Sequence, residues 1–166
     1  MSIGSMFAQE LAQEGATTRK YLERVTDDHL AWKPHEKSMT LGRLASHISE
    51  SLDWGNTTLE NDNFSMKTDG SFKPYDGASA EEILKTFDAG LEKLMAGLQS
   101  VDDATLAKNW QMIIDGNVAF EMPKMVVIRS WVLNHMIHHR GQLSVYFREN
   151  DIPVPATYGP SADEQG

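Results

Sequence analysis

The sequence contains no cysteine in its 166 residues. This absence excludes disulfide bonds, thiolate metal ligands and a cysteine nucleophile within the chain, so a bound metal would need histidine, carboxylate or water as ligands. Positive charge is also scarce, because 15 Lys and Arg stand against 24 Asp and Glu and give a formal net charge of −9. Since phosphate backbones and anionic lipids repel an acidic chain, we expect neither nucleic acid nor membrane as a partner.

Targeting and membrane signals are lacking as well. Residues 1–14 have no basic region followed by an apolar run, and the apolar stretch at residues 125–128 is far too short to cross a bilayer. We therefore expect a cytoplasmic protein. The sequence also lacks a glycine-rich phosphate loop, a nucleophile-elbow motif and the strand alternation of a dinucleotide-binding unit, which leaves nucleotide chemistry without support.

The residues that are present suit one globular domain. Hydrophobic residues make up 40% of the chain and charged residues 23%, and a chain of this length buries about two-thirds of its unfolded surface on folding. No internal repeat or linker divides the sequence, so we expect a single domain over residues 1–166. Its tail, residues 151–166, contains three prolines and two glycines and is predicted to be non-helical.

Apolar residues recur at helical spacing in four segments, which predicts four main helices. Thr40 can cap the second helix, and Ser79 with Glu82 has the spacing of a capping box at the start of the third. The predicted helices cover approximately residues 7–25, 41–58, 80–100 and 125–149.

The connections between these helices differ in character. Residues 110–114 and 118–122 are rich in strand-forming types and flank Asp115 and Gly116, which predicts a β-hairpin. Residues 61–77 are rich in Asn, Asp, Gly and Ser and are predicted to be a loop. The predicted fold class is therefore all-α with a small β-hairpin.

Two histidines lie inside the apolar stripe of the last predicted helix. At about 100° per residue, the wheel groups five residues within a sector of roughly 60°, namely Ile128, Val132, His135, His139 and Tyr146. Residues four apart point the same way on successive turns, so His135 and His139 can offer nitrogens to one ion. The spacing alone is equally compatible with a hydrogen-bonded buried pair or a chance surface pair.

His47 is the candidate for a third ligand. It flanks the apolar stripe of the second predicted helix, and an adjacent helix could bring it opposite His135 and His139. Three imidazoles would leave one or more coordination positions open, which is typical of a catalytic rather than a structural zinc site. Zinc, nickel, iron, cobalt and copper all accept three imidazoles, so the sequence does not select the metal.

Residues 135–143 read His-Met-Ile-His-His-Arg-Gly-Gln-Leu, which resembles the H-x-x-x-H-R-G-Q-[LI] signature of the DinB/YfiT-like superfamily. The segment Leu-Gly-Arg-Leu-Ala-Ser-His-Ile at residues 41–48 is similar to the pattern that holds the family's first histidine, and it follows a Trp-x-Pro element at residues 32–34. The tail at residues 154–164 is also similar to family members, so the resemblance spans nearly the whole chain.

The resemblance implies a four-helix bundle with an up-down-down-up arrangement. It matches His47, His135 and His139 one by one to the family's three metal ligands. One divalent metal ion per chain is therefore implied, with zinc or nickel as the first choice and iron, cobalt or copper as alternatives. The resemblance also implies a homodimer.

Two enzymatic functions follow from the resemblance, and both use an open metal position. One is the transfer of a low-molecular-weight thiol to an electrophilic small molecule, in which the metal activates the sulfur of the cosubstrate. The other is metal-dependent hydrolysis, which normally needs a carboxylate or imidazole to handle the proton of bound water. The sequence shows no clear general base beside the histidines, which favours thiol transfer. A third hypothesis is a metal-binding stress protein without turnover.

Four further residues are candidates for the surroundings of the metal or for a substrate pocket. His138 could shuttle a proton, although packing at the helix edge is the simpler interpretation. Gln142 could hydrogen-bond a ligand or make an ordinary amide contact. Tyr146 could close one end of the cavity, but a core tyrosine is the simpler expectation, and Trp54 is expected to pack as a wall.

Two charged residues also lie at positions that bear on the site. Glu14 falls among apolar positions of the first predicted helix and could act as a base, but we expect a rim carboxylate that faces solvent. Arg140 points away from His135 on the helical wheel, which favours an ion pair between helices over binding of an anionic substrate.

Overall fold

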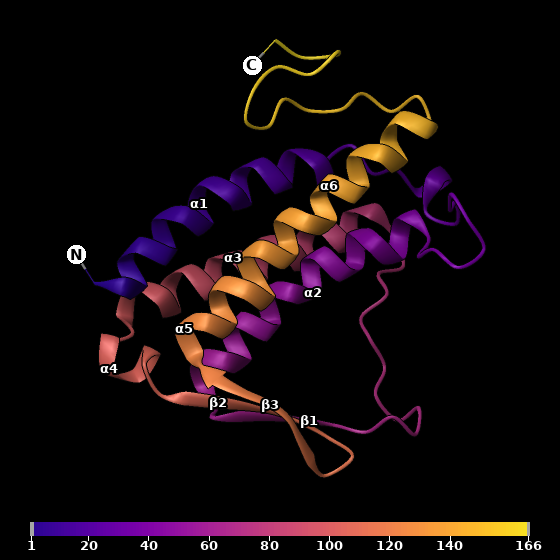
Figure 1. Cartoon of the computed structure of the whole chain (residues 1–166). Helices are drawn as coiled ribbons and strands as arrows, with labels where there is room; N and C mark the ends of the chain where they lie inside the picture. The colour runs from indigo at the N-terminus through magenta and orange to yellow at the C-terminus, as the bar shows by residue number, and fades with distance from the viewer. Residues whose placement is uncertain (1, 166) are drawn as a thin grey trace.

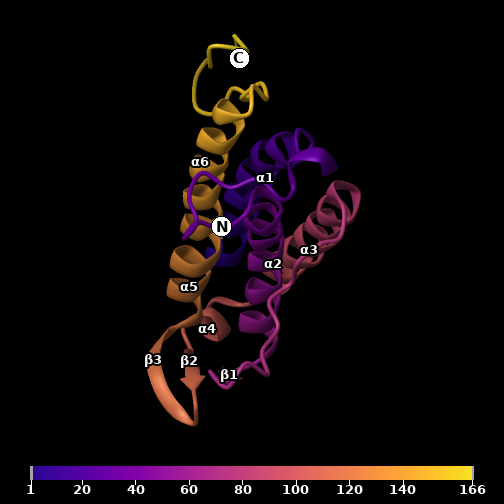
Figure 2. The same cartoon turned by 90° about the vertical axis from the view of Figure 1, so that its right-hand side faces the viewer.

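The computed structural model describes residues 2–165 and is mostly helical, with a small sheet at one end of the helices and the C-terminal tail at the other (Figure 1, Figure 2). In chain order the elements are α1 (Ile3–Leu22), η1 (Asp27–His29), α2 (Leu41–Glu60), β1 (Asn63–Met66), α3 (Ala80–Ser100), α4 (Asp103–Leu106), β2 (Asn109–Ile114), β3 (Asn117–Pro123), α5 (Lys124–Val127), η2 (Ile128–Leu133) and α6 (Asn134–Glu149). The segment η1 is a 3₁₀ turn and η2 is a π-helix. None of the described helices combines the length and the apolarity that crossing a membrane requires.

Side-chain caps define the starts of three long helices. Ser2 caps α1, Thr40 caps α2 and Ser79 caps α3, each by accepting a hydrogen bond from the backbone N–H three residues later. The starts predicted from Thr40 and Ser79 are confirmed because a cap is a local signal. Helix α1 begins earlier than its apolar pattern indicated, since the Ser2 cap precedes the first apolar turn.

The long helices enclose one apolar core. Helix α2 packs against α3 and α6, and α1 packs against the same two helices. Fully buried side chains from all of them meet in this core, among them Leu11, Leu44, Phe87 and Phe147. Gly15 permits a close approach of α1 to α3, because a Cβ built there would lie 2.8 Å from a methyl carbon of Leu91. The core thereby holds α2 and α6 side by side.

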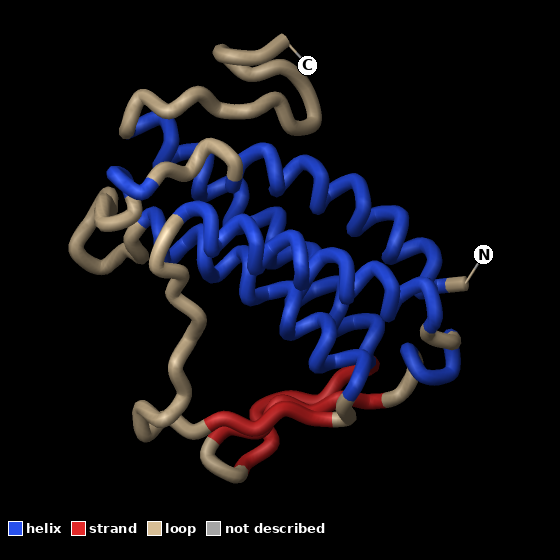
Figure 3. Tube along the Cα trace, turned by 180° about the vertical axis from the view of Figure 1, so that it is seen from behind, coloured by secondary structure: helices blue, strands red, loops and turns tan. Residues whose placement is uncertain are grey.

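The strands form a three-stranded sheet in the order β1-β2-β3 (Figure 3). The predicted hairpin is confirmed as the antiparallel pair β2 and β3, and its turn residues Asp115 and Gly116 both have positive φ. The prediction of a plain loop over residues 61–77 was wrong at β1, which pairs in parallel with β2. A four-residue strand carries little periodicity of its own, and its partner strand lies more than 40 residues away.

The last predicted helix is confirmed as a continuous helical run through α5, η2 and α6. Its middle, however, is π-helical over Ile128–Leu133, directly before His135. A wheel drawn at a constant angle per residue therefore does not hold across this run, because a π-helix turns less per residue than an α-helix. The spacing of His135 and His139 is unaffected, since both lie in α6.

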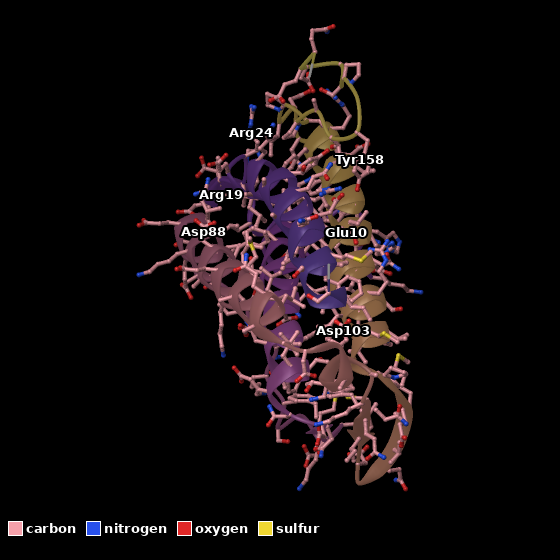
Figure 4. The ribbon with its side chains drawn as sticks, turned by 90° about the vertical axis from the view of Figure 1, so that its left-hand side faces the viewer. Glu10, Arg19, Arg24, Asp88, Asp103 and Tyr158 are labelled. Carbon is pink, nitrogen blue, oxygen red and sulfur yellow. The ribbon has the colours of Figure 1, made fainter. Side chains whose placement is uncertain are left out.

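Residues 151–165 form no regular element but are fastened to the helices. The Tyr21 hydroxyl of α1 hydrogen-bonds Thr157 at 2.8 Å, and Arg24 donates to Glu164 at 2.5 Å. Figure 4 shows Arg24 and Tyr158 at the end of the molecule where the tail folds over α1 and α6.

Glu14 does not face solvent, contrary to the prediction. Its carboxylate is buried and lies 2.8 Å from Nη1 of Arg140, and the Tyr158 hydroxyl donates to it at 2.9–3.0 Å. Nη2 of Arg140 donates in turn to the Tyr158 oxygen at 2.8 Å. The structural ion pair predicted for Arg140 is therefore present. Its partner is Glu14, which was predicted to be a solvent-facing carboxylate at the rim.

Candidate metal centre

Three histidines converge between α2 and α6. The ligand atoms of His47, His135 and His139 all lie within 4.8 Å of one another. The Nε2 atoms of His47 and His135 are 2.9 Å apart. Ligand nitrogens at about 2.0–2.1 Å from a tetrahedral zinc ion would be about 3.3 Å apart, so this pair needs to separate by only a few tenths of an ångström. The donor set and its spacing fit a divalent metal ion.

Hydrogen bonds fix the tautomers of two of these imidazoles. Nδ1 of His47 lies 2.6 Å from Oε1 of Glu50, and Nδ1 of His139 lies 2.7 Å from Oε1 of Gln142. Because a carboxylate only accepts hydrogen bonds, Nδ1 of His47 must carry a proton, so in the neutral ring the lone pair is on Nε2. The Gln142 oxygen assigns His139 in the same way. Such outer partners orient histidine ligands in many metal sites.

Glu50 is the residue of this site that the sequence analysis missed. It is buried, and it accepts hydrogen bonds from Arg43 at 2.7 Å and from the backbone N–H of Tyr75 at 2.8 Å, besides that from His47. Burial alone raises the pKa of the Glu50 carboxyl, but the bonds from His47 and Arg43 outweigh burial and the pKa lies below its ordinary value. One signal was available, since Arg43, His47 and Glu50 share one face of α2 at i, i+4 and i+7.

The electrostatics of the site favour the neutral form of His135 and His139. Burial, followed by the neighbouring His139, His47 and His138, lowers the pKa of His135 to about 4, although Glu50 acts in the opposite direction. Burial is also the main cause that lowers the pKa of His139. A neutral imidazole is the form that binds a metal, so these two side chains need not lose a proton to do so at neutral pH.

Of the other candidate residues, Trp54 lies beside the three histidines and Tyr146 lies in the core. Trp54 lies against the triad of His47, His135 and His139, with ring centroids 5.4 Å from His47 and 5.3 Å from His135. Tyr146 belongs to the core, where its hydroxyl donates to the Met39 carbonyl and its ring contacts Trp32 edge-on. The interpretation of Tyr146 as a core tyrosine therefore agrees with the structure.

His138 and Gln142 lie on the solvent side of α6, and both are exposed. The His138 ring stands edge-on to His139 at 4.9 Å between centroids, without a hydrogen bond to it. Gln142 contacts the triad through its bond to His139. Of this pair, only Gln142 hydrogen-bonds a member of the triad, and that member is His139.

A cavity of about 450 Å³ borders the triad at His47, while His135 and His139 are not part of its lining, which is almost wholly apolar. Helix α2 contributes Arg43, His47, Glu50 and Trp54 to its wall, and the sheet and the α5–η2 segment close the other sides. The sequence analysis predicted no such cavity, because its walls come from elements that are distant along the chain. Its volume is in the range of small-molecule sites.

Comparison with known proteins gives concordant matches. The sequence profile of the DinB family matches residues 1–165. The protein YrdA of Bacillus subtilis (strain 168) is 26% identical over 152 residues, which cover 91% of this chain and 85% of YrdA. YjoA of the same organism is 28% identical over 141 residues and 80% of each chain. Both relatives are named as uncharacterized proteins.

Solved structures extend the similarity to the fold. A DinB-like protein from Bacillus cereus ATCC 10987 superposes with a TM-score of 0.72 at 26% identity, over 92% of this chain and 95% of that one. The DinB-like YjoA structure from Bacillus subtilis gives 0.68 at 20% identity, over 97% and 99% of the two chains. Because its sequence identity is 20%, the YjoA structure supports similarity of the fold alone.

Proposed function

Because this chain belongs to the DinB family, we propose that it is a metal-dependent transferase that adds a low-molecular-weight thiol to an electrophilic small molecule. In this proposal His47, His135 and His139 hold one divalent ion per chain, zinc or nickel in the first place and iron, cobalt or copper otherwise. The observation that carries the proposal is the convergence of three imidazoles beside an apolar cavity of about 450 Å³. A cytoplasmic location remains a prediction.

The residues of the chain have distinct parts in this scheme. A divalent ion at the triad would lower the pKa of a coordinating thiol and so supply a thiolate near neutral pH. Glu50 and Gln142 accept hydrogen bonds from Nδ1 of His47 and His139, which orients both rings and leaves Nε2 as the nitrogen that would bind the ion. Trp54 packs against His47 and His135 on one side of the triad. The apolar cavity would receive the electrophile.

The alternative function is metal-dependent hydrolysis, and Glu50 is the residue that bears on it most directly. A hydrolase needs a group that takes a proton from water, and Glu50 is the buried carboxylate beside the triad. Both of its oxygens are already occupied, Oε1 by His47 and Arg43 and Oε2 by the Tyr75 N–H. A carboxylate that accepts three hydrogen bonds and has a lowered pKa is a weak base, which favours thiol transfer.

The direct test measures thiol transfer below the pKa of the free thiol. At pH 6.5 a thiol with a pKa of about 8.5 is only about 1% thiolate, so an enzyme that activates it has a large advantage. Bacillithiol, mycothiol and glutathione are offered with 1-chloro-2,4-dinitrobenzene, where the sulfur displaces chloride and the thiol proton goes to buffer. We expect metal-loaded wild type to accelerate the reaction with at least one thiol and His139→Ala to lose that acceleration.

Equal rates for wild type and His139→Ala would contradict thiol transfer. Metal-dependent cleavage of an ester or amide without thiol would instead establish the hydrolase. A metal-loaded protein that accelerates neither reaction would support the third hypothesis, a metal-binding stress protein without turnover.

Glu50 provides a second test of the metal site. Glu50→Gln should weaken metal affinity by about 10- to 100-fold, because an outer partner that orients a histidine ligand contributes that much. Competition with a chromophoric chelator measures the affinity. Asp53→Asn is the matched control, since it makes the same change on an exposed residue of α2. Equal affinities of the two variants would remove Glu50 from the metal site.

The proposal also includes the directions of the four long helices. We assign the long helices to an up-down-down-up four-helix bundle. The assignment is supported by the packing of α2 and of α1 against both α3 and α6. It is also supported by the long connection from β1 to α3, which runs back along the helices in Figure 3.

A homodimer is the remaining part of the proposal, supported by the family resemblance and by large apolar side chains that α6 and α5 leave exposed, such as Val145 and Val126. Sedimentation velocity over a wide concentration range should give twice the chain mass of 18.6 kDa. A species of the single-chain mass at every concentration would contradict it.

A further inference from the structure

Six aromatic side chains surround the cavity that borders the triad. They come from α2, β1, the connection from β1 to α3, β2, β3 and η2, and are Trp54, Phe64, Phe72, Trp110, Phe120 and Trp131. The chain has six Phe and four Trp residues, and the four that do not line the cavity belong to the main core or pack against it. The cavity therefore has an aromatic lining of its own, separate from the core that holds the long helices together.

The rings of this lining offer both faces and edges. Phe120 and Trp131 stack with 5.2 Å between their centroids and 14° between their planes, whereas Phe64 stands edge-on to Phe72 at 6.2 Å. Phe72 and Trp131 are 39% and 40% exposed, although such large apolar side chains gain free energy from burial. A further ring in the cavity would cover this surface and add stacked or edge-on contacts.

The ionisable side chains of the lining are already paired with one another. Glu50 accepts a hydrogen bond from Arg43 at 2.7 Å and one from His47 at 2.6 Å. Nη1 of Arg43 and Nε1 of Trp110 have no partner among the described residues, but both atoms are buried, so a molecule in the cavity does not reach them. A charged ligand would lose its hydration here without gaining a partner, which is costly. The lining therefore favours an uncharged molecule.

We propose that the electrophile is an uncharged aromatic molecule whose ring system lies among these six side chains. This substrate class rests on the proposed function, since that function makes the cavity the site of the electrophile. The volume of about 450 Å³ is in the range of sites for single small molecules. Because the cavity borders the triad at His47, a ring held in it lies beside one of the proposed metal ligands.

One pair of ligands separates aromatic selection from plain burial of apolar surface. Naphthalene and decalin share one carbon skeleton, and decalin is the more hydrophobic because it is saturated. A cavity that selects by apolar area alone would bind decalin at least as tightly. Equilibrium dialysis against metal-loaded protein should show naphthalene bound at least about threefold more tightly, within the range of one aromatic pair. Equal or tighter binding of decalin would overturn the aromatic assignment.

Charged naphthalenes test the absence of charge on the ligand. 2-Naphthoate is compared with 2-isopropylnaphthalene, and 2-naphthyltrimethylammonium with 2-tert-butylnaphthalene, which are uncharged molecules of similar shape. Chelator-treated protein is used, so that the carboxylate has no metal to coordinate. Each ion should bind at least about tenfold more weakly than its uncharged counterpart. Equal or tighter binding of either ion would overturn the assignment of an uncharged molecule.

Two matched substitutions locate the ligand. Phe120→Leu removes the ring that stacks on Trp131 and keeps an apolar side chain, so the preference for naphthalene over decalin should fall at least about twofold. Phe7 is half-buried like Phe120 but packs against the main core. Phe7→Leu should leave the preference unchanged. Equal effects of the two substitutions would place the ligand outside the cavity and overturn the proposal.

These measurements separate the inference from the proposed function, because binding is measured without thiol. Selective binding of naphthalene by a protein without thiol transfer would overturn the proposed reaction and support the ligand class assigned to the cavity. Thiol transfer by a protein that does not distinguish naphthalene from decalin would overturn the inference and leave the reaction standing. An affinity for naphthalene that falls as the protein concentration rises would assign the cavity to a second copy of the chain and overturn the small-molecule site.

Discussion

Replacing His47, His135 or His139 by alanine is expected to reduce bound divalent metal from one equivalent per chain to a small fraction. Each substitution removes one of the three proposed ligands, whose atoms lie within 4.8 Å of one another. The loss should exceed the roughly 100-fold that removal of an outer partner causes. Mass spectrometric metal analysis after dialysis against a limiting zinc or nickel buffer measures it.

His138→Ala is the matched control for these variants. It removes an imidazole from the same helix, and the His138 ring lies 4.9 Å from that of His139, but it is exposed and does not belong to the triad. We expect it to keep one equivalent of metal. If all three triad variants also keep one equivalent with wild-type affinity, the site is wrong.

Local signals explain what could be predicted of the fold. Thr40 and Ser79 mark helix starts because a capping side chain acts within three residues, and Asp115 with Gly116 marks a turn because both positions need positive φ. The grouping of His135 and His139 likewise followed from a spacing of four within one helix. The meeting of His47 with this pair depends on packing between α2 and α6, and periodicity alone left it open.

The features that were missed all depend on partners far along the chain. The strand β1 forms by pairing with β2, and Glu14 is buried because Arg140 and Tyr158, more than 120 residues away, satisfy its carboxylate. In the sequence Glu50 looks like an ordinary polar residue of α2. Its role depends on hydrogen bonds from Tyr75 and His47, which only the folded chain brings to it. Composition cannot distinguish such buried acids from the many exposed ones in a chain of net charge −9.

The buried pair of Arg140 and Glu14 should account for the largest effect on stability outside the apolar core. Arg140 is 2% exposed, and Arg140→Met would leave the Glu14 carboxylate buried without its cation. Loss of one partner of a buried ion pair typically costs about 3–5 kcal/mol of unfolding free energy. Urea denaturation of wild type and variant measures this difference.

Arg148→Met is the control for Arg140→Met, because it removes an arginine from the same helix whose ion pair with Asp163 is largely exposed. Its cost should stay below about 1 kcal/mol. Combining Arg140→Met with Glu14→Leu should restore much of the lost stability, since an apolar pair of similar volume carries no uncompensated charge. Equal costs for the two arginine variants would show that the buried pair is not what holds α1, α6 and the tail together.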